Sequence, residues 1–281
     1  MARSPFDPLT RIASPAAVAT NARTHEKEVL FCFVMSVVLV TGGSRGIGAA
    51  TARLAGERGY AVGVNYRVNR AAADAVVADI ERSGGRAIAL AGDVSSEPDV
   101  VRLFEAVDAR LGPLTALVNN AGVLEQQTRV EHIDADRLRR IFATNVDGAF
   151  LCAREAVRRM STVHGGAGGA IVNVSSRAAQ LGAPGEYVDY AASKGALDAL
   201  TIGLAREVAA EGIRVNAVRA GIIYSDIHAS GGEPGRVDRL GPTLPMRRGG
   251  HPIEVARAIL WLLSDEASYS TGTFIDVAGG R

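Results

Sequence analysis

Short apolar segments rich in β-branched residues alternate along the chain with longer segments of helical character. The first is Ser-Val-Val-Leu-Val at 36–40, and an unbroken apolar run of this length is typical of a strand buried in a parallel sheet. Six later segments are similar, and the sequence predicts a strand at each of them: 61–66, 87–91, 116–118, 170–174, 214–218 and 273–277. The chain is therefore expected to contain seven strands.

The segments between these strands predict helices. Residues 97–111 are amphipathic, because Leu103 and Val107 belong to one apolar stripe. Other helices are predicted from the turn after the first strand to about 59, from 186–194 onward, and at 70–83, 136–160 and 252–264. Strands that alternate with helices through right-handed crossovers predict an α/β fold, namely a doubly wound (Rossmann-type) parallel seven-stranded sheet with helices on both faces.

Residues 222–250 interrupt this alternation. They have little periodicity and contain two glycine or proline pairs, at 231–232 and 234–235. Long irregular segments inside a compact domain are usually functional lids or disordered. We therefore expect an irregular lid near the functional site.

Residues 1–34 differ in composition from the rest of the chain. They are expected to be a disordered tail or the product of an upstream start assignment, because Met35 directly precedes the first strand. The apolar run 29–40 has about 12 residues, too few to span a bilayer, and it lacks the pattern of a secretory signal. Residues 35–281 are expected to form a single domain.

Composition and charge exclude several classes of function. The 281 residues have a formal net charge of +1, which gives no argument for nucleic acid or a membrane surface as partner, so neither is expected. Cys32 and Cys152 belong to no motif and fit reduced thiols in a cytoplasmic protein. The five histidines have no ligand spacing, so no metal site is expected.

The first strand ends in a glycine-rich turn, Thr-Gly-Gly-Ser-Arg-Gly-Ile-Gly at 41–48, followed by an alanine-rich helix. This order aims free backbone N–H groups and the positive end of the helix at a pyrophosphate. The spacing is Gly-x-x-x-Gly-x-Gly, not the common Gly-x-Gly-x-x-Gly. A purely structural turn is the alternative, but the place after the first strand favours a nucleotide site. The candidate cofactor-binding residues here are Gly42, Ser44, Arg45, Gly46, Ile47 and Gly48.

The end of the second strand bears on the choice between NAD and NADP. NAD sites place a carboxylate there for the adenosine ribose, but residues 64–67 are Val-Asn-Tyr-Arg and include no acid. Arg67, together with Arg45, is placed to bind a 2′-phosphate through charge-assisted forked hydrogen bonds. Solvated surface arginines are the alternative. The pattern favours NADP(H) over NAD(H), with Tyr66 and Arg67 as further cofactor contacts.

Tyr190 and Lys194 are the strongest candidates for chemistry. They stand four residues apart at the start of a predicted helix, so the phenol and the ammonium share one face. A neighbouring cation favours the phenolate and lowers the pKa of the phenol, as proton transfer to a carbonyl or from an alcohol requires. A solvated helix face is the alternative for the pair taken alone. Asn145 stands in the middle of another predicted helix, where asparagine is unfavourable.

In order along the chain, these residues resemble the short-chain dehydrogenase/reductase family in its short single-domain form. The chain is most similar to the bacterial sugar- or glucose-dehydrogenase-like oxidoreductases of that family. The resemblance implies one NAD(P)-binding Rossmann-type catalytic domain at 35–281, although Ala220 replaces the proline usual before Gly221. It rests on Thr41-Gly42-x-x-x-Gly46-Ile47-Gly48, Asp93, Asn119-Asn120-Ala121-Gly122, Asn145, Ser176, Tyr190-x-x-x-Lys194 and Gly221.

The resemblance also implies roles for individual residues. Tyr190 would be the acid/base, and Lys194 would lower its pKa and bind the nicotinamide ribose. Ser176 would bind the substrate oxygen, and Asn145 would hold a water in the proton relay. The implied cofactor contacts beyond the glycine turn and Arg67 are Asp93, Val94, Asn120, Ala121, Gly122, Gly221 and Ile223.

Two residues are rivals of this catalytic set. Tyr187 is a second phenol, but position 191 is alanine, so it lacks a lysine partner and is expected to line the substrate side. Ser175 is a second hydroxyl, further from Tyr190 in sequence than Ser176.

The function implied is NADP(H)-dependent hydride transfer between the nicotinamide and a secondary alcohol or ketone, with a sugar, a polyol or a small carbonyl compound as substrate. A β-ketoacyl thioester (acyl-carrier-protein) reductase is the first alternative, which a basic patch at the lid would favour. A non-catalytic NADP-sensing protein is the second alternative. A homotetramer is expected, with a dimer as the alternative. The arginines of the lid are Arg236, Arg239, Arg247 and Arg248.

Overall fold

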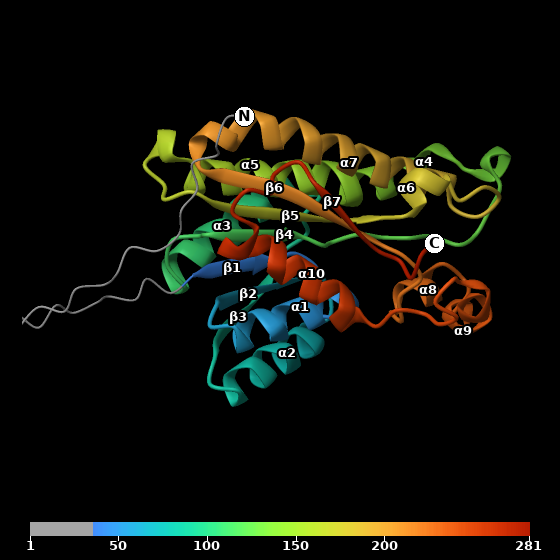
Figure 1. The fold of residues 1–281 in the computed structure, drawn as a ribbon, viewed down its shortest axis with the longest axis horizontal. Coiled ribbons are helices and arrows are strands. Elements are labelled where there is room, and N and C mark those ends of the chain that lie inside the picture. Colours follow the sequence, from blue (N-terminus) through green and yellow to red (C-terminus); the bar gives the residue numbers. More distant parts are fainter. Residues whose placement is uncertain (1–35) are drawn as a thin grey trace, which may run out of the picture. The chain divides into compact units, whose positions relative to one another are not determined.

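The computed structural model describes residues 36–281 (Figure 1), and the prediction made for residues 1–34 lies outside them. Seven strands form one parallel sheet. The prediction of seven strands is confirmed. Their bounds are β1 Val37–Val40, β2 Ala61–Tyr66, β3 Arg86–Ala91, β4 Ala116–Asn119, β5 Gly169–Ser176, β6 Ile213–Ala220 and β7 Phe274–Val277.

The order of the strands places the site. In the sheet they follow one another as β3-β2-β1-β4-β5-β6-β7. The chain therefore adds β2 and β3 on one side of β1, then crosses over and adds β4 to β7 on the other side. In a doubly wound sheet the ligand binds beyond the carboxyl ends of the strands at this reversal. The glycine turn at 41–48 and the segment after β4 meet there.

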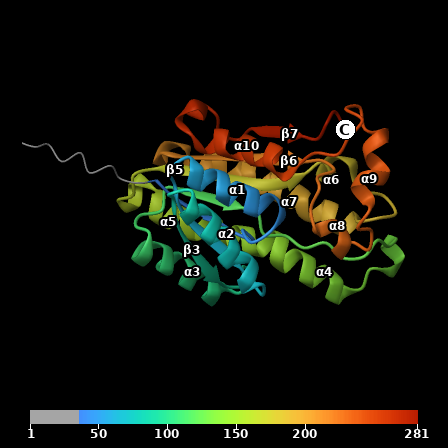
Figure 2. The ribbon, with the colours of Figure 1, turned by 90° about the horizontal axis from the view of Figure 1, so that it is seen from below.

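Helices cover both faces of the sheet, as the sequence predicts. The apolar side chains of α1, α2 and α10 pack on one face, and those of α3, α5 and α7 pack on the other. Figure 1 shows α5 and α7 on the opposite side of the sheet from α1 and α2, and Figure 2 shows α1 beside α10. The bounds are α1 Gly46–Glu57, α2 Arg70–Arg82, α3 Glu97–Arg110, α5 Gly148–Met160, α7 Val188–Val208 and α10 Pro252–Leu263.

The prediction of one continuous α-helix over 136–160 is wrong. The chain forms α4 at Ala135–Phe142, a π-helical turn at Ala143–Asp147, and then α5. Asn145 lies within the π turn, and its side chain bonds the backbone of Val123 in the segment after β4. A π turn widens the helix locally and is often found at functional sites. Here it accommodates a polar side chain that the α-helix would disfavour.

The lid at 222–250 is more ordered than the sequence suggests. It contains two short helices, α8 at Ile227–Ser230 and α9 at Arg236–Leu240. Its own apolar cluster joins Ile222, Val237 and Leu244. Figure 1 shows α8 and α9 beyond the ends of β5 and β6. A further short helix that the sequence did not predict, α6 at Ala178–Leu181, follows β5 directly.

Candidate active site

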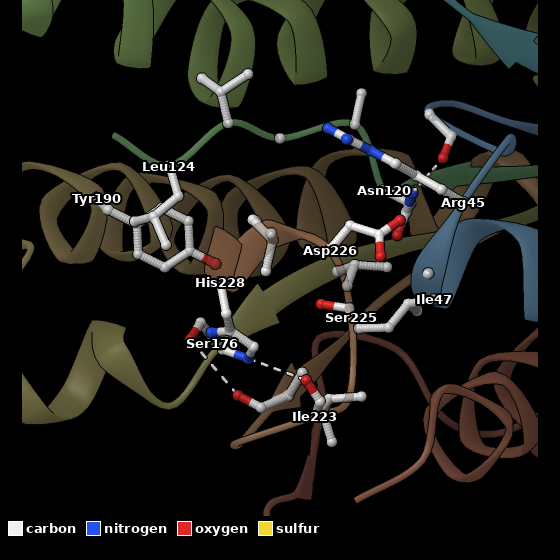
Figure 3. Close-up of a pocket in the computed structure, with 18 of the residues that line it drawn as sticks. Arg45, Ile47, Asn120, Leu124, Ser176, Tyr190, Ile223, Ser225, Asp226 and His228 are labelled. Carbon is white, nitrogen blue, oxygen red and sulfur yellow. Dashed lines mark hydrogen bonds between the residues drawn. The ribbon is translucent and has the colours of Figure 1, made fainter. Parts of the chain in front are cut away.

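A cavity of about 630 Å³ opens at the carboxyl ends of the strands. It gathers side chains from the glycine turn, from the ends of β2 and β5, from α7 and from the lid (Figure 3). Of the predicted site residues, Gly48 and Asn145 do not line it. Those that do are Gly42, Ser44, Arg45, Gly46, Ile47, Tyr66, Arg67, Asp93, Val94, Asn120, Ala121, Gly122, Ser176, Tyr190, Lys194, Gly221 and Ile223.

The glycine turn requires glycine for steric reasons. Gly42 and Gly46 have φ of 60° and 52°, in the left-handed region that favours glycine. A Cβ on Gly48 would lie 2.4 Å from the Gly42 oxygen and 2.5 Å from Nδ2 of Asn120, which donates to that same oxygen. Gly48 therefore contributes by letting α1 approach the turn closely rather than by facing the cavity.

Asn65 is a structural residue of the turn that sequence reasoning missed. It is buried in β2, its Oδ1 accepts from the Gly42 N–H at 3.1 Å, and its Nδ2 donates to the Gly92 oxygen at 3.0 Å. It thereby ties the glycine turn to the end of β3. In the sequence, the sign that could have identified Asn65 is that it is one polar residue in an otherwise apolar strand.

The two arginines expected to bind a 2′-phosphate have different surroundings. Arg67 lies 3.6 Å from Oδ2 of Asp93, whereas Arg45 is exposed and forms no ion pair with a described residue. Burial tends to raise the pKa of Asp93, but hydrogen bonds from Ser95 and the charge of Arg67 hold it below its usual value. Asp93 is thus an ionised carboxylate. Of the two arginines, Arg45 is the one whose side chain is not held by an ion pair with a described residue.

Tyr190 lies on α7 with its hydroxyl on the cavity side, close to Ser176 at the end of β5 (Figure 3). Although part of the ring faces the cavity, burial raises the pKa of Tyr190 to about 12, against the opposing effect of the Ser176 hydroxyl. The phenol is therefore protonated at neutral pH. The expectation that the Lys194 charge lowers this pKa is therefore wrong for this structure, where burial has the largest effect.

Lys194 is buried one turn along α7. Its Nζ donates to the Val174 oxygen at 2.7 Å and lies 5.7 Å from the centre of the Tyr190 ring. Burial lowers the pKa of Lys194 to about 8, and Asp198 partly opposes this. The ammonium thus changes charge close to physiological pH.

Asn145 does not line the cavity, but it bonds residues of two segments next to it. Its Oδ1 accepts from the Val123 N–H at 2.7 Å, and its Nδ2 donates to Oγ of Ser193 at 3.0 Å. A Cβ on Gly122 would lie 3.5 Å from Oδ1 of Asn145 and 3.6 Å from Nζ of Lys194. Asn145 therefore connects the segment after β4 to α7.

The rival residues have other partners. Oγ of Ser175 donates to Oδ1 of Asp198 at 2.6 Å and is buried. The Tyr187 hydroxyl donates to the Gly231 oxygen at 3.2 Å. Tyr187 lines the cavity beside the lid, and its place on the substrate side stays a prediction.

The lid arginines do not form an unneutralised basic patch. Arg236 pairs with Glu186 and Glu233, and its guanidinium lies over the Tyr187 ring. Arg239 also pairs with Glu233 and Arg248 pairs with Glu254, while Arg247 donates to the Pro242 oxygen. Arg236 therefore fastens the lid to the segment before α7.

Two features were not foreseen. The buried Arg137 of α4 binds Asp189, the residue before Tyr190, with Nε 2.6 Å from Oδ2. His228 of α8 lines the cavity on the lid side. Both depend on contacts between segments far apart in the sequence.

No group of His, Cys, Asp and Glu in residues 36–281 is arranged to hold a metal ion. No helix in the same range is long and apolar enough to cross a bilayer.

Comparisons with known proteins match nearly all of the described chain. A family model described as enoyl-(acyl carrier protein) reductase matches residues 42–281. The uncharacterized oxidoreductase YgfF of Escherichia coli is 61% identical over 88% of this chain and 100% of its own. A cis-4-hydroxycyclohexanecarboxylate dehydrogenase of Sinomonas cyclohexanicum is 39% identical over 88% of this chain and 97% of its own. A short-chain type dehydrogenase/reductase from Mycobacterium marinum superposes with a TM-score of 0.81 at 33% identity, covering 87% of this chain and 94% of its own.

Proposed function

Because the chain belongs to the short-chain dehydrogenase/reductase family of oxidoreductases, which act on CH–OH groups, we propose that it transfers a hydride between NADP(H) and a secondary alcohol or ketone. One observation carries the proposal. The glycine turn and the set Ser176, Tyr190 and Lys194 line the same cavity. A dinucleotide site is thus joined to an acid/base group and a hydroxyl that can bind a carbonyl oxygen.

The residues present fit a dinucleotide. The turn lacks side chains at Gly42 and Gly46, and α1 begins there without a side-chain cap on its N–H groups, which suits a pyrophosphate. The bound nicotinamide would supply the hydride. Arg45 and Arg67 would hold the 2′-phosphate, Asp93 and Val94 the adenine, and Lys194 the nicotinamide ribose.

The protein would handle the proton and orient the substrate. In reduction, the Ser176 hydroxyl binds the carbonyl oxygen and the Tyr190 phenol gives its proton to that oxygen. In oxidation, the same phenol oxygen takes the proton from the alcohol. The raised pKa of Tyr190 keeps the phenol protonated, which suits reduction, and the Lys194 cation stabilises the phenolate left behind.

Absorbance of the reduced nicotinamide tests this function. NADPH and NADH would each be supplied with sugars, small ketones, diketones and a β-ketoacyl thioester, and NADP and NAD with polyols. Turnover of a ketone or secondary alcohol would support the proposal. Tight cofactor binding without turnover of any compound would favour the NADP-sensing alternative.

The β-ketoacyl thioester alternative has less support. The family model's description names acyl-carrier substrates, but Arg236, Arg239 and Arg248 are neutralised by glutamates within the chain. An acidic carrier protein would meet few free cations at the lid. A small alcohol or ketone therefore fits the entrance better.

Arg45→Ala and Arg67→Ala are each expected to raise the KM for NADPH about ten- to hundredfold while changing the KM for NADH little. Hydrogen bonds to charged groups contribute about 1.5–3 kcal/mol, and NADH lacks the phosphate. Arg70→Ala, which removes an exposed arginine paired with Asp74 on α2, is the matched control. Equal losses with both cofactors, or a wild-type preference for NADH, would refute the NADP assignment.

The pH profile of reduction should report the state of Lys194. Tyr190 stays protonated until pH about 12, but Lys194 loses its charge as the pH rises through its pKa of about 8. The kcat/KM for NADPH, which reports groups of the free enzyme, should therefore be level at lower pH and fall near pH 8. In Lys194→Arg the guanidinium stays charged, so any remaining activity should lack this fall. A wild-type profile that stays level to pH 10 would contradict the prediction.

We also propose a homotetramer. Phe150 on α5 and Ile202 on α7 are exposed apolar residues on one layer of helices, and Trp261 on α10 and Tyr269 before β7 are exposed elsewhere. Light scattering after gel filtration should give four times the chain mass of 29.3 kDa. Phe150→Glu should reduce that mass by disrupting one interface. A wild-type mass of one chain would contradict the proposal.

A further inference from the structure

Arg281 brings a cation to the wall of the active-site cavity. It lines this cavity together with Tyr190 and Ser176. The turn before it has Gly279 and Gly280 at φ of 60° and 87°, in the left-handed region that favours glycine. Figures 1 and 2 show the C-terminus near α6 and the short helices of the lid. The chain therefore turns back from β7 toward the site.

The backbone of Arg281 is held in place. Its N–H donates to the Ala278 oxygen at 3.2 Å, and its main-chain oxygen accepts from Nε of Arg177 at 2.7 Å. A Cβ on Gly280 would lie 2.9 Å from Cβ of Pro245, so the turn before Arg281 also packs closely on the lid. The side chain is thus presented from a fixed point of the cavity wall.

The guanidinium of Arg281 has no counter-charge of its own among residues 36–281, since it forms no ion pair with any of them, and the residue is exposed. The neighbouring cations are neutralised. Arg177 pairs with Asp276. Arg236 binds both carboxylate oxygens of Glu186 through its two Nη groups. Glu186 is therefore already engaged, and the Arg281 cation is left for a ligand.

The charges that act on Arg281 belong to one side of the cavity. Burial and the Arg236 charge lower the pKa of Arg281. Glu186 opposes this lowering, and Arg177 adds a smaller one in the same direction. All three line the part of the cavity formed by the lid and by residues 176–187. The guanidinium stays charged at neutral pH, and an anionic group bound beside it would offset the repulsion between these cations.

We propose that Arg281 binds a carboxylate group of the substrate, so that the enzyme prefers oxo acids and the corresponding hydroxy acids over uncharged ketones and alcohols. This rests on the proposed function, because it names the substrate class of the same site. The planar guanidinium presents parallel N–H groups that match the two oxygens of a carboxylate. The carbonyl oxygen of the same molecule would lie at Ser176 and Tyr190, so the spacing between carboxylate and ketone would also determine which acids are turned over.

Turnover of matched substrates tests the proposal. Oxo acids of increasing chain length would each be compared with the corresponding primary amide, which has nearly the same shape and no charge. For at least one length, the wild-type kcat/KM should be about ten- to hundredfold higher for the acid. In Arg281→Gln this ratio should fall to about one, whereas Arg281→Lys, which keeps the charge but not the fork, should retain part of it. Arg257→Gln, which removes an exposed arginine of α10 outside the cavity, should leave the ratio unchanged.

A ratio of one or less for every chain length, or a ratio that Arg281→Gln retains, would overturn the proposal. Failure of every ketone to turn over with either cofactor would instead count against the proposed function, and calorimetry with the full-length protein then decides on Arg281. An oxo acid of at least one length should bind with a dissociation constant about tenfold or more below that of its amide, and Arg281→Gln should remove the difference. Equal dissociation constants in the wild type, or a difference that this variant retains, would mean that Arg281 holds no carboxylate, and the proposal would fail.

Discussion

Replacing Tyr190 by phenylalanine is expected to lower kcat about 10²- to 10⁴-fold, the usual contribution of a positioned general acid/base. The substitution removes only the hydroxyl that would give the proton to the substrate oxygen. The ring and its neighbours on α7 are retained, so the cofactor dissociation constant should change little. Steady-state kinetics together with NADPH binding by fluorescence would measure both quantities.

Tyr187→Phe is the discriminating comparison, because Tyr187 is the rival phenol three residues before Tyr190 in the same cavity and its hydroxyl already donates to Gly231. We expect it to change KM more than kcat. The assignment of the acid/base would be wrong if Tyr187→Phe abolished turnover while Tyr190→Phe kept it. Thermal unfolding of both variants would show that neither has lost its fold.

Arg137→Leu is expected to destabilise the fold by about 3–5 kcal/mol, because it leaves a buried carboxylate without its partner. The side chains of Arg137 and Asp189 are 9% and 0% exposed. Arg137 also donates to the Gln126 oxygen at 2.7 Å, and Oδ1 of Asp189 accepts from the Tyr190 N–H at 2.9 Å. The pair thus joins α4, the segment after β4 and the start of α7, and its loss should also displace Tyr190 and lower kcat.

Arg139→Ala is the matched control on the same helix. Arg139 pairs with Asp136, and both side chains are exposed, so this change should cost about 0–1 kcal/mol. Denaturant unfolding of the two variants gives the comparison. Equal stability of Arg137→Leu and Arg139→Ala would show that the buried pair does not support the fold.

The strands and the glycine turn could be predicted because local sequence determines them. A buried parallel strand such as β1 is apolar on both faces. The turn needs glycine where the backbone has positive φ or a neighbour lies too close, as at Gly42 and Gly48. The four-residue spacing of Tyr190 and Lys194 likewise predicts that they share one face of α7, because a helix has a fixed period.

The features that could not be predicted depend on contacts between distant segments. The π turn exists where Asn145 reaches the backbone of Val123, and nothing in residues 136–160 alone encodes that partner. The short helices of the lid are too short to be stable by themselves and are held by contacts such as Arg236 with Glu186.

The ionisation of the site could not be predicted from the sequence either. Sequence spacing places a cation one turn from Tyr190 and so indicates a lowered pKa, but the opposing effect of burial depends on everything packed around the ring. The pKa of Tyr190 is instead raised by burial to about 12.

Transfer of deuterium from NADPH labelled at C4 of the nicotinamide tests hydride transfer most directly. Cofactor labelled on one face or on the other would be supplied with a ketone that the enzyme reduces, and the product would be examined by mass spectrometry. We predict one deuterium at the new carbinol carbon from one of the two labelled cofactors and none from the other, with product formation in Tyr190→Phe slowed in proportion to its lower kcat. A reduced product that carries no deuterium from either cofactor would contradict direct hydride transfer in this site.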